Sequence, residues 1–393
     1  RACRAAGGAR VERFLGLKHD PRIRPGLSQV GARPITLTVE NCALTLARNE
    51  KRKWCPMPCA CGLDVHAHVI PASFPRYLRE PAPADWPSMA PAEKPCHAHV
   101  MISGKVYRTV SDKCWDVPKR VADMEEMGLS LQAVSPMPEL LSYWMPAGDA
   151  AELLRYINDQ TAEMVAASDG RLVGLGAVPL QDLDLAAAEL HRVKEELGFS
   201  GIEIGSNVNG VPVGHPSLDP FFAEVERLNM AVFVHALRPV GMERLVGPKN
   251  LQQVLAYPTD VGLAAASVIC SNLMLRRPRL RIAFSHGGGT LASLLPRLEQ
   301  GWKVFPAVHE AVSASPSEQA RLLYYDALVF DTPMLRHLVA QFGDDRVMVG
   351  TDYPFAFHDS EPVRRVCEAV EDEAARERIL HRNARAFLGL PEA

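Results

Sequence analysis

Eight short apolar runs alternate with longer amphipathic segments along most of this chain. Each run has six to eight residues, the usual length of a buried strand, and the intervening segments carry apolar residues at helical spacing. The runs cover residues 63–68, 131–136, 172–179, 201–206, 231–236, 281–286, 324–330 and 347–354. Eight strands with helices between them, over about 325 residues, predict an α/β fold of the (β/α)8 TIM-barrel type.

An open, doubly wound sheet is the alternative fold, but the chain has no G-x-G-x-x-G segment. Polar residues instead recur at the carboxyl ends of the strands, where a barrel places its active site. The long, proline-rich gap between the first two strands contains the alternating stretch HVMISGKVYRTV. We therefore expect a small β-rich insertion at about residues 75–115, beside the mouth of the barrel.

Residues 1–60 differ in kind from residues 61–393, which we assign to the barrel. They hold 12 Lys and Arg against 4 Asp and Glu, and show no sustained helical or strand period. We expect a disordered leader or an upstream translation artefact, with a mitochondrial transit peptide as the alternative. Cys55, Cys59 and Cys61 form a cluster without a second ligand pair at zinc-finger spacing, so we expect no metal there.

Composition limits the classes of partner. The net charge is −3, which provides no general attraction for nucleic acid or anionic membranes. No run of about 18 uncharged apolar residues occurs, and no apolar signal segment follows the basic start. We expect a cytoplasmic protein that binds a small molecule, with no nucleic-acid or membrane partner.

Two histidines end the first strand, as DVHAH. Residues two apart lie on the same face of a strand, so His66 and His68 can bind one metal ion. A second H-x-H, His97 and His99, begins a strand instead of ending one. We place that pair in the insertion and expect no metal on it.

Three further strand ends carry similar residues. His235 ends AVFVHA, His286 ends RIAFSH, and Asp352 follows VMVGT. Taken alone, each would be read as a hydrogen-bonded core histidine or a turn aspartate. Together at one barrel mouth they predict a catalytic metal centre, since three His and one Asp suit Zn²⁺, with Mn²⁺ or Fe²⁺ as alternatives.

At this level of detail the chain resembles the amidohydrolase superfamily, and within it the aminocarboxymuconate-semialdehyde decarboxylase group. The resemblance runs from about residue 62 to 390. Its matching segments are DVHAHVIP, KVYRTVSDKCWD, LLSYW, GLGAVPLQ, ELGFSGIEIGSNVN, VFVH, FSHGGG, YYDALVFD, GTDYPF and NARAFLGL.

The resemblance implies roles for particular residues. It implies that a single zinc ion is bound by His66, His68, His235 and Asp352, and that His286 is the catalytic acid/base, with Asp352 as a further proton acceptor. It also implies a homodimer, with Arg108 holding the substrate carboxylate and Arg297 reaching the neighbouring subunit's site. Phe355 would pack on a flat substrate, or be an ordinary aromatic at the barrel mouth.

The chain departs from the family in one loop. After His235 it reads Ala-Leu-Arg-Pro where the family has Pro-Trp, and residues 241–256 are only weakly similar. We expect this loop to line the pocket, with Arg238 as either a carboxylate contact or a surface residue. The fourth strand, GIEIGS, lacks the Lys that a binuclear hydrolase would need.

The sequence therefore predicts a metal-dependent, non-oxidative decarboxylase of an unsaturated or aromatic carboxylate, similar to an aminocarboxymuconate semialdehyde. A hydrolase of a lactone or amide, or a hydroxybenzoate-type decarboxylase, is the alternative. Both an arginine fork for the carboxylate and a metal acting as Lewis acid suit the decarboxylase.

Overall fold

The computed structural model describes residues 62–392, and these contain eight parallel strands in one sheet. The sheet order is β1-β5-β6-β7-β10-β11-β12-β13, which follows the chain. The strands are β1 (Gly62–Val69), β5 (Leu129–Pro136), β6 (Leu172–Gly176), β7 (Gly201–Gly205), β10 (Ala231–His235), β11 (Arg281–Phe284), β12 (Tyr324–Asp326) and β13 (Val347–Met348). All eight predicted strands are confirmed. The predicted leader, with Cys55, Cys59 and Cys61, lies outside the described residues.

The first strand also pairs with the segment that follows the last one. Parallel bridges join Asp64 to Val349 and Ala67 to Tyr353. The Val65 amide donates to the Val349 carbonyl at 3.0 Å, and the His68 amide to the Tyr353 carbonyl at 2.7 Å. These bonds close the sheet, so the predicted barrel is confirmed.

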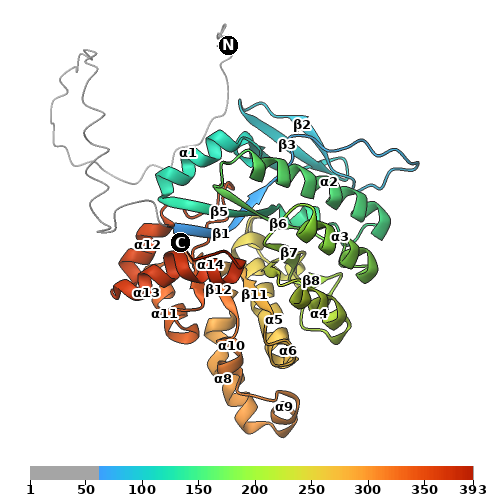
Figure 1. Cartoon of the computed structure of the whole chain (residues 1–393). Coiled ribbons are helices and arrows are strands. Elements are labelled where there is room, and N and C mark those ends of the chain that lie inside the picture. Colours follow the sequence, from blue (N-terminus) through green and yellow to red (C-terminus); the bar gives the residue numbers. More distant parts are fainter. Residues whose placement is uncertain (1–61, 393) are drawn as a thin grey trace, which may run out of the picture. The chain divides into compact units, whose positions relative to one another are not determined.

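Helices follow the strands and surround the sheet (Figure 1). The longer ones are α1 (Val117–Met127), α2 (Ala147–Ala166), α3 (Leu183–Glu195), α4 (Asp219–Arg227), α5 (Tyr257–Cys270), α8 (Leu291–Val304), α11 (Thr332–Phe342) and α12 (Pro362–Ala369). Local sequence sets their ends. In α1, the Asp116 carboxylate accepts from the Lys119 amide at the start, and Gly128, at φ 76°, ends the helix in the left-handed conformation.

One segment of the described chain, Gln252–Cys270, is long and apolar enough to span a membrane by length and composition alone. Half of it is buried inside the protein. Its buried residues include Val261, Ala265 and Val268, which belong to the main hydrophobic core. This segment therefore packs as a core helix of the barrel.

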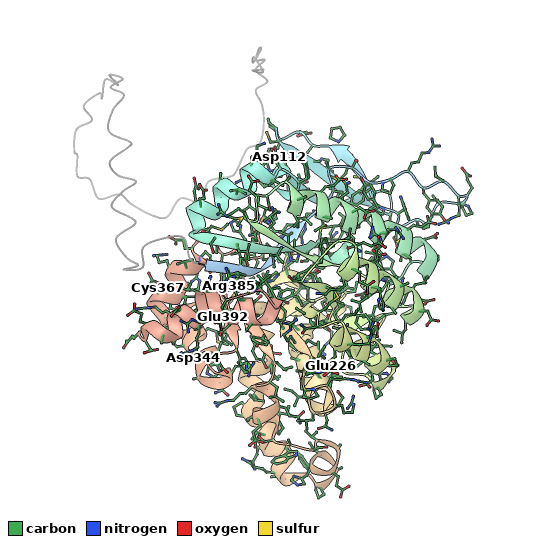
Figure 2. All side chains as sticks on the ribbon, in the orientation of Figure 1. Asp112, Glu226, Asp344, Cys367, Arg385 and Glu392 are labelled. Atoms are coloured by element: carbon green, nitrogen blue, oxygen red, sulfur yellow. The ribbon has the colours of Figure 1, made fainter. Side chains whose placement is uncertain are left out.

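The barrel interior holds its own apolar cluster, separate from the layer between sheet and helices. Leu63, Val65 and Phe233 belong to it, and Phe387 and Leu388 of α14 (Asn383–Leu388) complete it. The C-terminal helices are tied down nearby, because Asp344 (Figure 2) pairs with Arg378 at 2.6 Å. Buried apolar residues thus fill one part of the barrel and leave the polar residues to the other.

The predicted insertion after the first strand is confirmed. It is an antiparallel sheet of β2 (Ser88–Pro91), β3 (His97–Ile102) and β4 (Lys105–Ser111). Val100 and Val110 are buried against the main core, which fixes the sheet to the barrel. Strand β4 carries Arg108, so this insertion delivers side chains to the barrel mouth.

Candidate active site

A break in the strand register at β1 brings its two histidines into the barrel. Leu63 and Val65 belong to the interior cluster, whereas Ala67 belongs to the layer under the helices. The pairing with β5 is irregular between Asp64 and Ala67. Such a bulge shifts the alternation by one residue, which lets His66 and His68 point inward above Val65.

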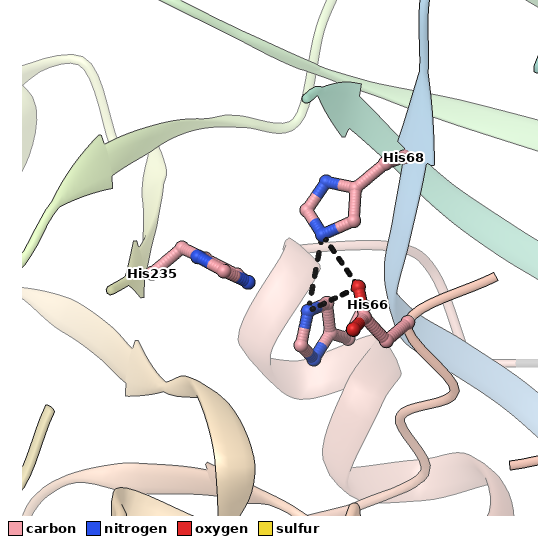
Figure 3. A group of neighbouring side chains, drawn as sticks. His66, His68 and His235 are labelled. Carbon is pink, nitrogen blue, oxygen red and sulfur yellow. Dashed lines mark hydrogen bonds and ion pairs between the residues drawn. The ribbon is translucent and has the colours of Figure 1, made fainter. Parts of the chain in front are cut away.

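The predicted metal ligands lie together. His66, His68, His235 and Asp352 each offer one ligand atom, and these atoms all lie within 4.8 Å of one another. The Nε2 atoms of His66 and His68 are 3.2 Å apart, and Asp352 Oδ1 lies 3.1 Å from His68 Nε2. Figure 3 shows the three imidazoles converging from two strands.

The second ring nitrogen of each histidine has a protein partner. His66 Nδ1 lies 2.6 Å from Asp326 Oδ2, His68 Nδ1 3.2 Å from the Pro136 carbonyl, and His235 Nδ1 2.9 Å from the Ala236 carbonyl. Each acceptor holds a proton on Nδ1, so that Nε2 is the nitrogen that each ring can offer to a metal. Buried His235 Nε2 and Asp352 Oδ1 have no hydrogen-bond partner in the described chain. These orphaned atoms fit a bound cation.

The protonation states of the cluster residues bear on whether they can bind a cation. Burial lowers the pKa of His66, but its bond to Asp326 and the charges of Asp326 and Asp352 outweigh burial and raise the pKa to about 9. Burial, then the charge of His286, holds the pKa of His235 well below its usual range. Burial raises the pKa of Asp352, but the neighbouring His68 ring and the charges of the surrounding histidines lower it overall. Neutral His235 and ionised Asp352 are the forms that bind a metal.

His286 sits on a left-handed turn directly after β11. Its φ is 54°, and Gly287, Gly288 and Gly289 also have positive φ. The Asp326 carboxylate accepts from the His286 amide at 3.1 Å and the Gly287 amide at 2.7 Å. The ring centroid lies 5.0 Å from that of His235. Burial, and then the charge of His66, lowers the pKa of His286 to about 4.

A cavity of about 980 Å³ opens over this centre. Its lining includes His235, His286 and Asp352, together with Arg108 and Phe355. The Arg108 side chain forms no hydrogen bond or ion pair within the described chain; its guanidinium carbon lies 4.1 Å from the centroid of the Phe355 ring. That ring also stacks on His68, with centroids 5.3 Å apart. Phe355 therefore links the arginine to a metal ligand, and the arginine's donors remain available to a ligand.

Comparison with known proteins agrees with this geometry. The amidohydrolase family model matches residues 63–390. This chain belongs to the amidohydrolase family. Over 332 residues it is 35% identical to 2-amino-3-carboxymuconate-6-semialdehyde decarboxylase of Dictyostelium discoideum, covering 84% of this chain and 91% of that protein. The predicted resemblance to that decarboxylase group is confirmed.

Two further amidohydrolases are informative. Gamma-resorcylate decarboxylase of Rhodococcus jostii is 30% identical, over 59% of this chain and 74% of that protein. The solved structure of a dihydroxybenzoic acid decarboxylase from Polaromonas, with bound manganese and 2-nitroresorcinol, superposes with a TM-score of 0.64 and 25% identity. That match covers 72% of this chain and 89% of that one.

The other predicted site residues of this amidohydrolase lie apart from the metal cluster. Arg297 is exposed on α8 and does not line the cavity. Arg238 stacks on Trp144, 3.2 Å from the ring centroid, beside a separate cavity of about 220 Å³. His97 reaches the rim of the main cavity, but neither it nor His99 joins the metal-ligand group found among the described residues.

The prediction for the loop after His235 is confirmed in part. Asn250, Gln253 and Val254 line the main cavity, as expected of residues 241–256. Arg238 is not among the residues that line it. Its ring contact with Trp144 places it in the wall of the smaller cavity instead.

Sequence reasoning missed the residues behind the ligands. Asp326 accepts from the His66 ring and from the turn at His286, so one carboxylate positions a ligand and the proposed acid/base. Glu203 lies 3.6 Å from His68 Nδ1, and burial raises its pKa to about 7. Asp326 ends β12 in the structure, but the predicted strand ran on to residue 330, so the predicted bounds placed this aspartate inside the strand. The Glu203 contact depends on neighbouring strands and has no local signal.

Proposed function

We propose that this amidohydrolase is a metal-dependent, non-oxidative decarboxylase of an unsaturated or aromatic carboxylate, similar to an aminocarboxymuconate semialdehyde. The observation that carries the proposal is that two residues of the metal-ligand cluster, His235 and Asp352, line one cavity with His286 and the unpaired Arg108. The relatives named above, all decarboxylases of such acids, support it.

The chain's own residues then have distinct tasks. The planar guanidinium of Arg108 binds the substrate carboxylate through paired hydrogen bonds. Its contact with Phe355 fixes the direction of that fork. When bound to His66, His68, His235 and Asp352, the metal supplies a Lewis acid that stabilises the negative charge left on the substrate.

His286 moves the proton. Its Nδ1 lies 3.1 Å from Ser285 Oγ, and the side chain faces the cavity. As the carbon–carbon bond breaks, its electron pair stays on the substrate carbon and CO₂ leaves. The ring then relays one proton from water in the cavity to that carbon, and the new carbon–hydrogen bond replaces the bond to the lost carboxylate. Asp352, beside the rings of His66 and His68, is the second group able to accept a proton.

Several finer assignments belong to the same proposal. We propose zinc, because three imidazoles and one carboxylate form the donor set, with manganese or iron as alternatives. We also propose a homodimer in which Arg297 enters the partner's cavity, a cytoplasmic location, and contact of Phe355 with a flat substrate. The exposure of Arg297 on α8 is compatible with a position at an interface.

The rival function is hydrolysis of a lactone or amide, and Arg108 separates the two. Arg108→Lys keeps the charge but loses the fork, so CO₂ release from 2-amino-3-carboxymuconate 6-semialdehyde or 2,6-dihydroxybenzoate should fall by about two to three orders of magnitude. Metal content should stay unchanged. The matched control is Arg279→Lys, at a position that does not line the cavity.

Water labelled with ¹⁸O completes the test. Hydrolysis must place the label in a new product carboxylate, whereas decarboxylation forms no such group. Incorporation of label there, together with an Arg108→Lys variant at nearly full rate, would replace the decarboxylase by the hydrolase.

A further inference from the structure

A second unpaired charge lies in the active-site cavity. Glu139 belongs to the 3-10 turn η3 (Pro138–Leu141), which directly follows β5, and it lines the same cavity as Arg108. No Lys or Arg lies within ion-pair distance of Glu139 in the described chain. The other basic residues of the lining are Lys113, which pairs with Asp123, and Lys94, which is exposed at the rim.

One phenol donates to the Glu139 carboxylate, and a second lies close enough to feel its charge. The Tyr257 hydroxyl donates to Glu139 Oε1 at 2.9 Å. Burial, and then the charge of Glu139, raises the pKa of Tyr107 above its usual range. Tyr257 lies on α5 and Tyr107 on β4 beside Arg108, so a barrel helix fixes this acid and the insertion lies beside it.

The chemistry of a carboxylate limits what can bind beside it. An ionised carboxylate only accepts hydrogen bonds, about four in all, and one position on Glu139 is filled by Tyr257. A substrate carboxylate at Arg108 would be repelled by a second, unpaired carboxylate in the same partly desolvated cavity. A donor group on the substrate that faces Glu139 replaces this repulsion with a charge-assisted hydrogen bond.

We propose that Glu139 is a specificity-determining residue that accepts a hydrogen bond from an N–H or O–H group of the substrate. The amino or hydroxyl substituent of such an acid would then face Glu139. This inference rests on the proposed function for the carboxylate at Arg108. Glu139 itself has no part in breaking the carbon–carbon bond.

Binding of unreactive pairs tests the inference without turnover. The three aminobenzoate isomers are compared with the three methylbenzoates, because a methyl group has a similar size and no donor. Calorimetric titration of the zinc-loaded chain should show at least one amino isomer binding about 10- to 100-fold more tightly than its methyl counterpart, the range expected for a hydrogen bond to a charged group. No preference for any isomer would overturn the proposal.

The variants assign the preference to this side chain. Glu139→Leu should remove the preference for the amino compound, and Glu139→Gln, which preserves the shape of the side chain, should reduce this preference. The control Glu371→Leu, at an exposed position outside the cavity, should keep the preference. A preference as large as that of the unmodified chain in either Glu139 variant would overturn the proposal. If the Glu139→Leu variant does not fold, the Glu139→Gln variant alone provides the test.

The same titrations separate this inference from the proposed function. Arg108→Leu should weaken both members of each pair about equally, leaving their ratio intact. If the amino preference depends on Glu139 but no CO₂ is released from any amino- or hydroxy-substituted acid, the decarboxylase assignment fails and the specificity assignment stands.

Discussion

At the scale of single residues, the centre depends on carboxylates that are not themselves ligands. Asp326 is fully buried and accepts hydrogen bonds from the His66 ring and from the amides of His286 and Gly287. Such a partner fixes the tautomer and direction of a ligating imidazole and increases its basicity. Replacing Asp326 should therefore change the affinity of the site for a metal ion.

Asp326→Asn keeps the size of the side chain and removes its charge. We expect zinc affinity to fall about 10- to 100-fold, the usual cost of losing such a partner. Competition with a chelator of known affinity measures it, and Asp345→Asn, at an exposed position, serves as the control. Unchanged affinity would mean that His66 does not need this bond to bind zinc.

Zinc affinity should also depend on pH through His66. In the metal-free chain its pKa is raised to about 9, so the ring is protonated at neutral pH and must lose that proton when zinc binds. Apparent affinity should rise about tenfold per pH unit from pH 6.5 to 8.5 and level off above about 9. The slope should be shallower in Asp326→Asn, which lacks the main group that raises this pKa. A flat profile in the unmodified chain would show that His66 is already neutral.

At the scale of elements, the turn between β11 and α8 positions His286 by close approach of two backbones. A Cβ atom at Gly289 would lie 1.8 Å from the Pro258 carbonyl oxygen at the start of α5, and its φ of 59° disfavours any side chain. Only glycine satisfies both conditions. The neighbouring helix therefore holds the turn in place.

Gly289→Ala should destabilise the protein by at least about 3 kcal/mol, because steric overlap adds to the cost of the left-handed backbone. Gly170→Ala is the matched control: its φ is 78°, but no atom lies within 4 Å of the added methyl, so about 1 kcal/mol is expected. Urea unfolding compares the two. Equal losses would show that α5 can move away from the turn.

At the scale of the whole molecule, the proposed role of Arg297 depends on the proposed dimer. It is exposed on α8 and lies outside the cavity of its own chain. The proposed homodimer gives it a place in the partner's cavity. Each site would then be made from two chains.

Complementation between two inactive variants tests this shared site. Mixing His286→Ala chains with Arg297→Ala chains should restore about a quarter of full activity, since half of the dimers are mixed and one of their two sites has both groups intact. Each variant alone should stay inactive. If subunits exchange but no activity returns, the arginine is not shared.

The sequence by itself determined the barrel, the insertion and the metal ligands. Strand length and helix spacing are local properties, and the carboxyl ends of barrel strands always meet at one mouth, so three histidine-bearing strand ends and Asp352 could be grouped without coordinates. The family resemblance then implied which four residues bind the metal, and these four lie together. The period of two also placed His66 and His68 on one face. The barrel and the shared mouth needed only distances along the chain and a known topology, whereas the choice of ligands needed the family resemblance.

Only the tertiary structure decided what surrounds these ligands. The irregular pairing near Asp64, the bond from Asp326 to His66 and the placement of Glu139 opposite Tyr257 depend on strand register and on contacts between distant segments. A shift of one residue in register turns a side chain to the opposite face of a strand. Sequence spacing therefore cannot say which buried carboxylate meets which histidine, because packing across the closed barrel settles it.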